Sequence, residues 1–171
     1  LPAAWQQAVV DKTNALGADL IVITGDLQDG APRERAADVA PFAGFHAKDG
    51  VLAVPGNHEY YVDYPGWMAA FKAMGLPVLE NRHVVITHGG ARLVVAGLTD
   101  PQASAFGQAP PDLKAALSGA PAGVPVLVLA HRPGAAPEHA RAGVALQLSG
   151  HTHGGQIWGV NLLTKWANHG F

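Results

Sequence analysis

Four short apolar runs, each followed at once by Asp, Asn or His, constrain the fold of this chain more than any other feature. The runs read LIVITGD, VLAVPGNH, VPVLVLAH and VALQLSGHTH, and they close at positions 26, 58, 131 and 153. Short runs rich in Val, Ile and Leu predict buried strands. In open α/β sheets, sites form in the crevice beyond the carboxyl ends of the strands. The four runs therefore predict a sheet that gathers these polar side chains at one edge.

Segments with the spacing of helices separate the apolar runs. Helices are predicted from Pro2 to Gly17, over residues 34–45, around Trp67 and Phe71 up to Gly75, and over residues 112–117. Residues 78–98 predict strands with a hairpin at His88-Gly89-Gly90, and residues 102–111 predict a surface loop. Strands that alternate with helices indicate an α/β fold with a largely buried sheet. We expect residues 1–171 to form a single domain.

Composition narrows the classes of function. Hydrophobic residues make up 49% of the chain and charged residues 14%, which favours a folded protein with a sizeable core. The formal net charge of −2 argues against nonspecific nucleic-acid binding, which needs a broad basic surface. The chain has no cysteine, so disulfides and thiolate zinc sites are excluded. No apolar run approaches the roughly 18 residues of a membrane span, and no signal peptide is visible.

The side chains that follow the apolar runs are candidate metal ligands. They are Asp26, Asn57, His131, His151 and His153. One carboxylate, one amide oxygen and three imidazoles suit Mn²⁺, Fe or Zn²⁺ better than Ca²⁺ or Mg²⁺. His151 and His153 are two residues apart and cannot point the same way in an extended loop, so they favour two ions over one. Asp26 can bridge both ions, and two ions roughly 3.5–4 Å apart form the usual clamp for displacement at phosphorus.

Glycines support this interpretation. Gly25, Gly56 and Gly150 each precede a candidate ligand by one residue. Glycine lets the chain turn sharply out of a strand and lets the backbone approach an ion or a phosphate closely. Gly154 and Gly155 follow the last histidine, and we expect them to leave room for a substrate.

Each candidate also has a structural interpretation. Asp26 is a common type of turn residue, Asn57-His58 is compatible with a plain turn, and His131 with a strand-end histidine satisfied by backbone. The four strand ends together favour a metal site. Asp29 either has a functional role or caps the turn. Arg132 either meets a substrate phosphate or is solvated, and solvation is slightly favoured.

Other polar and aromatic residues lack such a context. Asp100-Pro101 predicts a turn, and surface or turn positions are expected for five histidines, namely His46, His83, His88, His139 and His169. Trp67, Phe71 and Met74 are expected in the core. Tyr60 and Tyr61 either flank a substrate pocket or pack. Ile157-Trp158 and Leu162-Leu163 are expected to be an uncovered part of the core.

The strand-end residues resemble a known family. GDLQD, GNHE, the lone histidine of LAHRP, and GHTH resemble motifs two to five of the calcineurin-like metallophosphoesterase superfamily. GNHEYY and GHTHGGQ resemble its branch of membrane-associated bacterial phosphodiesterases related to UDP-2,3-diacylglucosamine hydrolases, enzymes of lipid A biosynthesis. The resemblance covers the whole chain. It implies a four-layer αββα sandwich.

The resemblance also implies roles for individual residues. Asp26 would bridge two metals, and Asn57, His131 and His151 would complete the second metal site. His153 would belong to the first site. His58 would protonate the leaving group with help from Asp29, and Arg132, Gly154 and Gly155 are candidates for contact with substrate.

One departure from the family pattern concerns the first metal site. The family's first motif, Asp-x-His on a strand before the first helix, occurs nowhere in the 171 residues. We expect this strand upstream of Leu1 and further closing strands after Phe171, so that the sandwich is incomplete at both ends and the chain itself is weakly active.

The resulting hypothesis is a metal-dependent phosphoesterase. It would hydrolyse a phosphodiester or pyrophosphate bond through a metal-bound hydroxide at a centre of two divalent ions of the Mn, Fe or Zn class. The resemblance implies a phosphate-ester substrate, with a lipid-linked one as an option. It also implies a bacterial protein that is membrane-associated or extracytoplasmic through parts outside this chain. Two alternatives stay open: a metal-binding module without catalytic activity, and a protein whose metal only braces the fold.

Overall fold

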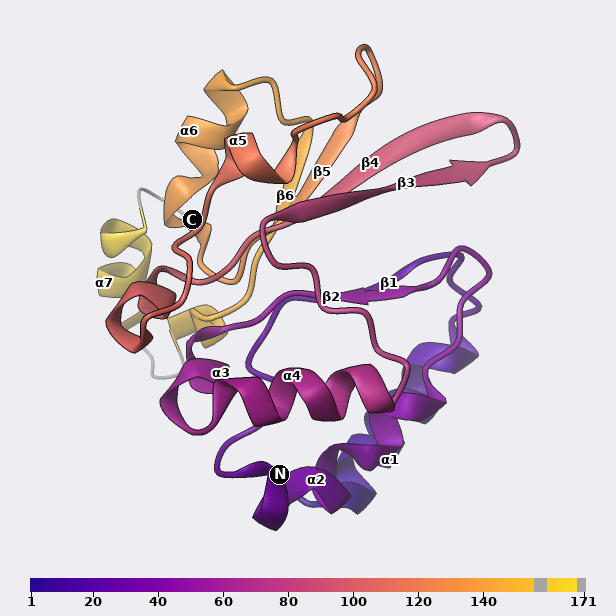
Figure 1. Ribbon diagram of the computed structural model, residues 1–171, viewed down its shortest axis with the longest axis vertical. Helices are drawn as coiled ribbons and strands as arrows, with labels where there is room; N and C mark the ends of the chain where they lie inside the picture. Colours follow the sequence, from indigo (N-terminus) through magenta and orange to yellow (C-terminus); the bar gives the residue numbers. More distant parts are fainter. Residues whose placement is uncertain (156–159, 169–171) are drawn as a thin grey trace.

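Two β-sheets lie face to face between helices in the computed structural model, which describes residues 1–155 and 160–168 (Figure 1). The first half of the chain contains α1 (Ala3–Ala15), β1 (Ile21–Ile23), α2 (Pro32–Val39), η1 (Ala40–Gly44), β2 (Val51–Ala53), α3 (Asn57–Tyr61), α4 (Tyr64–Ala73) and β3 (Arg82–His88). The second half contains β4 (Ala91–Gly97), η2 (Pro101–Phe106), α5 (Leu113–Ala116), β5 (Val126–Leu129), η3 (Pro133–Ala135), α6 (Ala136–Arg141), β6 (Leu146–Leu148), η4 (His153–Gly155) and α7 (Val160–Ala167).

The two sheets differ in size and direction. β1 and β2 pair in parallel, with Ile21 opposite Val51 and Ile23 opposite Ala53. The second sheet has the order β3-β4-β5-β6, in which β3 and β4 form an antiparallel hairpin and the other two pairs are parallel. The loops that follow β1, β2, β5 and β6 therefore meet at one end of the sheets, and the β3–β4 hairpin turns at the other (Figure 1).

Three apolar clusters make this a four-layer structure. The first fills the space between the small sheet and α1, α2 and α4, and includes Val10, Trp67 and Phe71. The second lies between the sheets and joins Val54 of the chain after β2 to Val95 and Leu129 of the larger sheet. The third covers the outer face of the larger sheet under α5 (Ala96, Val128 and Ala116). Figure 1 shows this order of helices, sheet, sheet and helices, which confirms the αββα sandwich.

The alternation of side chains along β5 continues to His131, two residues after the strand ends. Leu127 and Leu129 belong to the cluster between the sheets, whereas Val128 and Ala130 belong to the outer cluster. Because side chains alternate along a strand, His131 continues the row that faces the small sheet. The apolar pattern of this run thus directs His131 toward the loop that follows β1.

Most predicted elements are confirmed, but one segment differs from the expectation, and α3 and α6 as well as α7 were not predicted. Residues 102–111 were expected to form a loop, but Pro101–Phe106 forms a 3₁₀ helix whose first turn is capped by Asp100, since its Oδ1 accepts a hydrogen bond from the backbone nitrogen of Gln102 at 2.8 Å. Leu162 and Leu163 within α7 are 69% and 66% exposed, as an uncovered apolar face requires, whereas Ile157-Trp158 lies outside the described residues.

No helix in residues 1–155 or 160–168 is long and apolar enough to cross a membrane.

Candidate metal centre

Glycines allow the loops after β1, β2 and β6 to approach each other. A Cβ atom on Gly25 would lie 2.5 Å from the backbone nitrogen of Gly56 and 2.8 Å from Nδ1 of His131. A Cβ atom on Gly56 would lie 2.2 Å from Oδ1 of Asp26, and one on Gly150 would lie 3.0 Å from Oγ1 of Thr24. Side chains at these positions would push the loops apart. All three glycines therefore permit a close approach between loops, whereas the predicted approach of the backbone to an ion or a phosphate stays a prediction.

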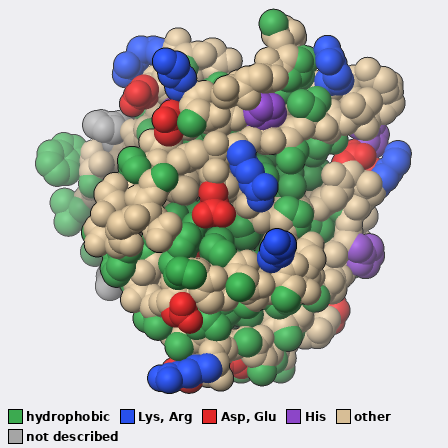
Figure 2. Space-filling view, in the orientation of Figure 1, with side chains coloured by type: hydrophobic (Ala, Val, Ile, Leu, Met, Phe, Trp, Pro, Cys, Tyr) green, Lys and Arg blue, Asp and Glu red, His purple; other side chains and the backbone are tan. Residues whose placement is uncertain are grey.

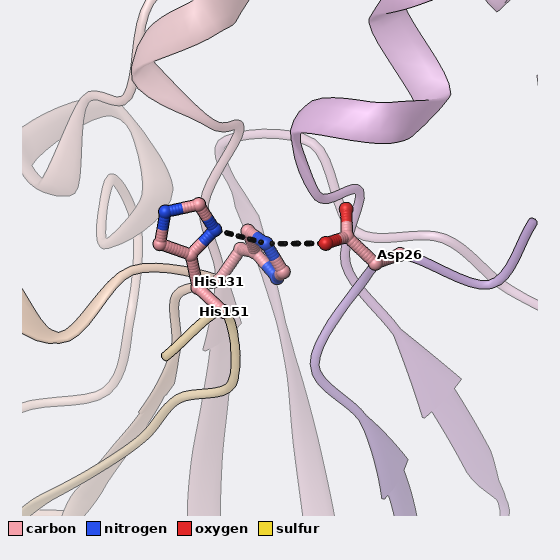
Figure 3. Close-up of side chains that lie close together, drawn as sticks. All are labelled: Asp26, His131 and His151. Carbon is pink, nitrogen blue, oxygen red and sulfur yellow. Dashed lines mark hydrogen bonds and ion pairs between the residues drawn. The ribbon is translucent and has the colours of Figure 1, made fainter. Parts of the chain in front are cut away.

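Nε2 of His131 is the centre of the group that results. It lies 3.0 Å from Oδ2 of Asp26, 3.1 Å from Oδ1 of Asn57 and 3.1 Å from Nδ1 of His151. Figure 3 shows the ring of His131 between Asp26 on one side and His151 on the other. Four side chains from four strand ends thus converge, as the sequence predicted. Asp26 and His151 reach their places with left-handed backbone, at φ 56° and 67°.

The partners of these side chains orient them as ligands. Nδ1 of His131 lies 2.7 Å from the carbonyl oxygen of Thr24, which can only accept, so Nδ1 carries the proton. Nε2 of the neutral ring then presents a lone pair to the other three residues. The Nδ2 of Asn57 donates to the hydroxyl of Tyr61 at 3.0 Å, which turns Oδ1 of Asn57 inward. Lone pairs that meet in this way need a proton or a cation between them.

The spacing of the donor atoms fits a divalent transition ion. Two ligands that each lie about 2.1 Å from an ion, at a right angle to one another, are about 3.0 Å apart. The three distances to Nε2 of His131 have this value. A carboxylate, an amide oxygen and two imidazoles form a donor set suited to Mn²⁺, Fe or Zn²⁺. The residues therefore fit the metal that the sequence predicted.

Electrostatics favour an ionised Asp26, a neutral His151 and a positive charge at His131, at the middle of the group. Burial disfavours the carboxylate of Asp26, but hydrogen bonds with His131 and with the backbone nitrogen of His58 outweigh it and hold the pKa of Asp26 below its usual value. Burial likewise disfavours a charged His131, yet its hydrogen bonds to Asp26 and Thr24 raise its pKa. Burial and then the charges of Arg132 and His131 lower the pKa of His151, which keeps that ring in the neutral form that binds metals.

Glu59 joins two of the ligand loops and was not identified from the sequence. Its side chain is fully buried. Its carboxylate accepts hydrogen bonds from the backbone nitrogens of Asp26 at 3.0 Å, Leu27 at 2.7 Å and Gly56 at 2.6 Å. Glu59 thereby fixes the turn that aims Asp26 at His131. The run GNHE offered a signal for this role, because a glutamate so close to a buried strand needs hydrogen-bond partners.

His58 and Asp29 lie together beside the metal centre. Nδ1 of His58 forms a hydrogen bond with Oδ1 of Asp29, which is an ion pair when His58 is protonated, and both side chains are accessible to solvent. The ring of Tyr61 lies 5.3 Å from that of His58. The pairing agrees with the expected cooperation of His58 and Asp29, and it leaves Nε2 of His58 outside the pair.

His153, Gly154 and Gly155 do not join the central group. His153 is exposed in η4 with φ at 50°. A Cβ atom on Gly155 would lie 2.3 Å from Cα of Asn161, so this glycine lets the loop pack against α7. Their predicted roles toward the first metal and the substrate stay predictions.

Three expectations about single residues were wrong. Arg132 is not simply solvated, since its Nε donates to Oδ2 of Asp100 at 2.9 Å, and Asp100 is fully buried instead of lying in an ordinary turn. His139 is buried because α6 packs against β6, where Nδ1 of His139 lies 2.6 Å from Oε1 of Gln147. For the two tyrosines the structure decides between the alternatives left open: Tyr60 packs against Tyr64, whereas Tyr61 borders the site.

The remaining histidines follow expectation more closely. His46 and His88 are exposed, His83 is half-buried with its Nδ1 2.7 Å from the carbonyl oxygen of Ala116, and His169 lies outside the described residues. His88 belongs to a second group with Asp19 and Asp49, in which one ligand atom of each lies within 4.8 Å of the others. Asp19 and Asp49 precede β1 and β2, so this group lies at the end of the sheets opposite to the metal centre.

Comparison with known proteins identifies the family. Residues 2–155 match the family described as calcineurin-like phosphoesterase. The chain therefore belongs to the calcineurin-like phosphoesterase family, which supports a metal-dependent phosphoesterase in general.

The similar proteins come from animals and bacteria. The chain is 32% identical to "Transmembrane protein with metallophosphoesterase domain" of Danio rerio over 92% of its length, and 36% identical to the Bos taurus protein of that name over 90%. It is 32% identical over 93% to an uncharacterized metallophosphoesterase of Helicobacter pylori. The chain covers 38%, 37% and 42% of these relatives, respectively, well under two thirds of their length.

A solved structure shares the fold. The NAD nucleotidase of Haemophilus influenzae superposes with a TM-score of 0.59 at 17% identity, over 88% of this chain and 36% of that one.

Proposed function

We propose that this chain hydrolyses a phosphodiester or pyrophosphate bond at a centre of two divalent ions of the Mn, Fe or Zn class. The observation that carries this proposal is the convergence of Asp26, Asn57 and His151 on Nε2 of His131 at 3.0–3.1 Å. These four side chains would hold one ion. Asp26 would also reach the second ion, with His153 as a further ligand.

The chain's own residues supply positioning and a proton. Divalent ions, when bound, acidify a water molecule and neutralise charge on the phosphoryl oxygens. Glu59 keeps Asp26 aimed at the ions, through its three backbone hydrogen bonds. His58 would donate a proton to the departing oxygen, and Asp29, paired with its Nδ1, would hold the ring with Nε2 toward the substrate.

A groove beside β1 supports the second ion. In the described residues β1 pairs only with β2, and its other edge borders a cavity of about 440 Å³ lined by apolar side chains such as Trp5, Val9 and Phe42. Asp26 and Gln28 line the same cavity, and Oε1 of Gln28 is buried without a hydrogen-bond partner in the described part of the chain. A strand laid parallel to β1 along this edge would end beside Asp26, where an Asp-x-His sequence would supply the further ligands.

Membrane association is part of the proposal. The two vertebrate relatives are named as transmembrane proteins. α7, which follows the loop of His151 and His153, exposes Leu162, Leu163 and Trp166, and Figure 2 shows hydrophobic side chains projecting from the edge of the molecule where α7 lies in Figure 1. An apolar surface near the metal centre favours a lipid-linked phosphate ester as substrate.

The experiment combines metal loading with hydrolysis. The chain is loaded with Mn²⁺ and assayed with bis(4-nitrophenyl) phosphate and with a pyrophosphate diester, beside Asp26→Asn as the control that lacks the bridging carboxylate. Mn²⁺-dependent hydrolysis that Asp26→Asn abolishes supports the proposal. Hydrolysis that needs no metal, or that survives in Asp26→Asn, contradicts it.

The second candidate is a metal-binding module without catalytic activity. The observation that favours it is the lack of Asp-x-His in the 171 residues. A version extended by a strand that carries Asp-x-His separates the two: recovery of a second Mn²⁺ equivalent together with turnover supports the enzyme, whereas a second equivalent without turnover supports the inactive module.

A further inference from the structure

Arg132 is next to the metal centre in the chain and lines a neighbouring pocket. It follows His131 directly in the chain, and its positive charge is one of the causes that lower the pKa of His151. Both His131 and Arg132 line a pocket of about 340 Å³ whose other walls include Leu98, Thr99 and Leu113. This volume is in the range of small-molecule sites. A ligand on the metal centre would therefore have Arg132 and this pocket beside it.

Asp100 fixes one edge of the Arg132 guanidinium. Asp100 is fully buried, and its Oδ2 accepts from Nε of Arg132 at 2.9 Å. Its Oδ1 accepts from the backbone nitrogen of Gln102 at 2.8 Å, which anchors the carboxylate at the start of η2. The carbonyl oxygen of Arg132 accepts from Nε2 of Gln147 at 3.3 Å, so the backbone is held as well.

The terminal nitrogens of Arg132 remain for a ligand. Within the described residues, only Nε of its side chain takes part in a hydrogen bond or ion pair, and the side chain keeps 33% of its surface exposed. Arginine presents five N–H donors in a planar fork, and four of them belong to the two terminal nitrogens. Such a fork matches two oxygens of a phosphate, and a partner that holds Nε reduces the rotamer freedom lost on binding.

We propose that Arg132 binds a non-reacting phosphate oxygen of the ligand at the metal centre, and that Asp100 is the positioning residue that orients Arg132. This inference rests on the proposed function and specifies how its substrate is held. The pocket beside Arg132 receives the organic group attached to the phosphate. The alternative is a purely structural role, in which the Arg132–Asp100 ion pair only connects the ends of β4 and β5.

Inorganic phosphate is the probe that tests this assignment. Its affinity for the Mn²⁺-loaded chain is measured by calorimetry for Arg132→Ala, Asp100→Asn and the double variant. Arg132→Ala should weaken phosphate binding roughly 10- to 100-fold, the range for loss of charge-assisted hydrogen bonds. Asp100→Asn should weaken it by about 3- to 10-fold and have no further effect in the Arg132→Ala background, because Asp100 acts through Arg132. Arg141→Ala, which removes an exposed guanidinium on α6, should change nothing.

Several outcomes would overturn the assignment. Unchanged phosphate affinity in Arg132→Ala with normal Mn²⁺ binding refutes it while the proposed function stands. An equal effect of Asp100→Asn with and without Arg132 refutes the positioning role. If Arg132→Ala does not fold, since it leaves Asp100 buried without a partner, Arg132→Lys replaces it. Lysine keeps the charge but lacks the fork, so wild-type phosphate affinity in Arg132→Lys refutes the proposal as well. If the unmodified chain binds no Mn²⁺, the proposed function itself fails.

Discussion

Two groups of aspartate and histidine lie at opposite ends of the same two sheets. One consists of Asp26, His131 and His151, at the carboxyl ends of β1, β5 and β6. The other consists of Asp19, Asp49 and His88, before β1 and β2 and at the end of β3. By residue type and distance both could hold a metal ion. Their surroundings, however, differ in almost every respect.

The difference lies in how the ligands are held. His131 is 2% exposed and both of its ring nitrogens have partners, with Nδ1 on the carbonyl of Thr24 and Nε2 at the centre of the group. His88 is exposed and pairs through Nδ1 with Asp49 at 2.6 Å, an arrangement that an ordinary surface ion pair explains. Metal centres depend on outer partners that orient the ligands. We therefore expect metal binding at the first group and weak binding at most at the second.

The largest effect is expected when one aspartate of each group, Asp26 or Asp49, is replaced and the two single variants are compared. Asp26→Asn should lower Mn²⁺ affinity by well over about 100-fold, more than the loss of an outer partner does, because a ligand charge is removed from a largely buried site. Asp49→Asn should leave Mn²⁺ binding unchanged. Elemental analysis after dialysis of both variants measures this. Equal metal loss in the two variants would remove the distinction between the ends of the molecule.

The two solvent-accessible histidine–aspartate pairs give the next comparison. His58→Ala should lower turnover of a phosphodiester roughly 10²–10⁴-fold, the usual contribution of general acid–base catalysis, with metal content nearly unchanged. His88→Ala removes a similar pair at the other end and should leave turnover unchanged. Steady-state kinetics with metal analysis on both variants decides between them. Loss of metal from His58→Ala would show that His58 is a ligand.

A substitution of Glu59 tests whether residues that orient the ligands of the first group contribute to its metal affinity. Glu59→Gln keeps the size of the side chain but turns one acceptor oxygen into a donor that faces backbone N–H groups. Mn²⁺ affinity should fall about 10- to 100-fold, as for other outer partners of metal sites. Asp112→Asn, a change at the exposed cap of α5, is the matched control. A folded Glu59→Gln protein with wild-type affinity would disprove the positioning role of Glu59.

The smallest effect expected is that of the second group on the stability of the protein. His88→Ala should change the free energy of unfolding by no more than about 1 kcal/mol, since exposed ion pairs contribute little. Urea unfolding with and without Zn²⁺ measures this. A Zn²⁺-dependent stabilisation that His88→Ala removes would show that the second group binds metal after all.

The sequence predicted the candidate ligands that lie at the ends of strands. It missed contacts that depend on how loops far apart in the chain pack together. Asp26, Asn57, His131 and His151 were predicted because each follows an apolar run at once, and parallel strands bring such positions together. Asp100, Arg132 and Glu59 have partners about 30 residues away. A local run such as GNHE can indicate that Glu59 needs partners, but not which residues they are. His139 was misjudged because only the packing of α6 on β6 buries it. α7 was missed although Val160, Leu163 and Ala167 recur at the spacing of a helix.

The most direct test of the central claim is an anomalous diffraction map at the manganese edge, from crystals soaked in Mn²⁺. We predict a strong peak bonded to Nε2 of His131, Nδ1 of His151, Oδ1 of Asn57 and Oδ2 of Asp26, at about 2.1–2.3 Å from each. A second peak toward His153 should be weak, because Asp26 and His153 are the only predicted ligands there. A strongest peak at Asp49 and His88, or no peak within reach of His131, would contradict the account.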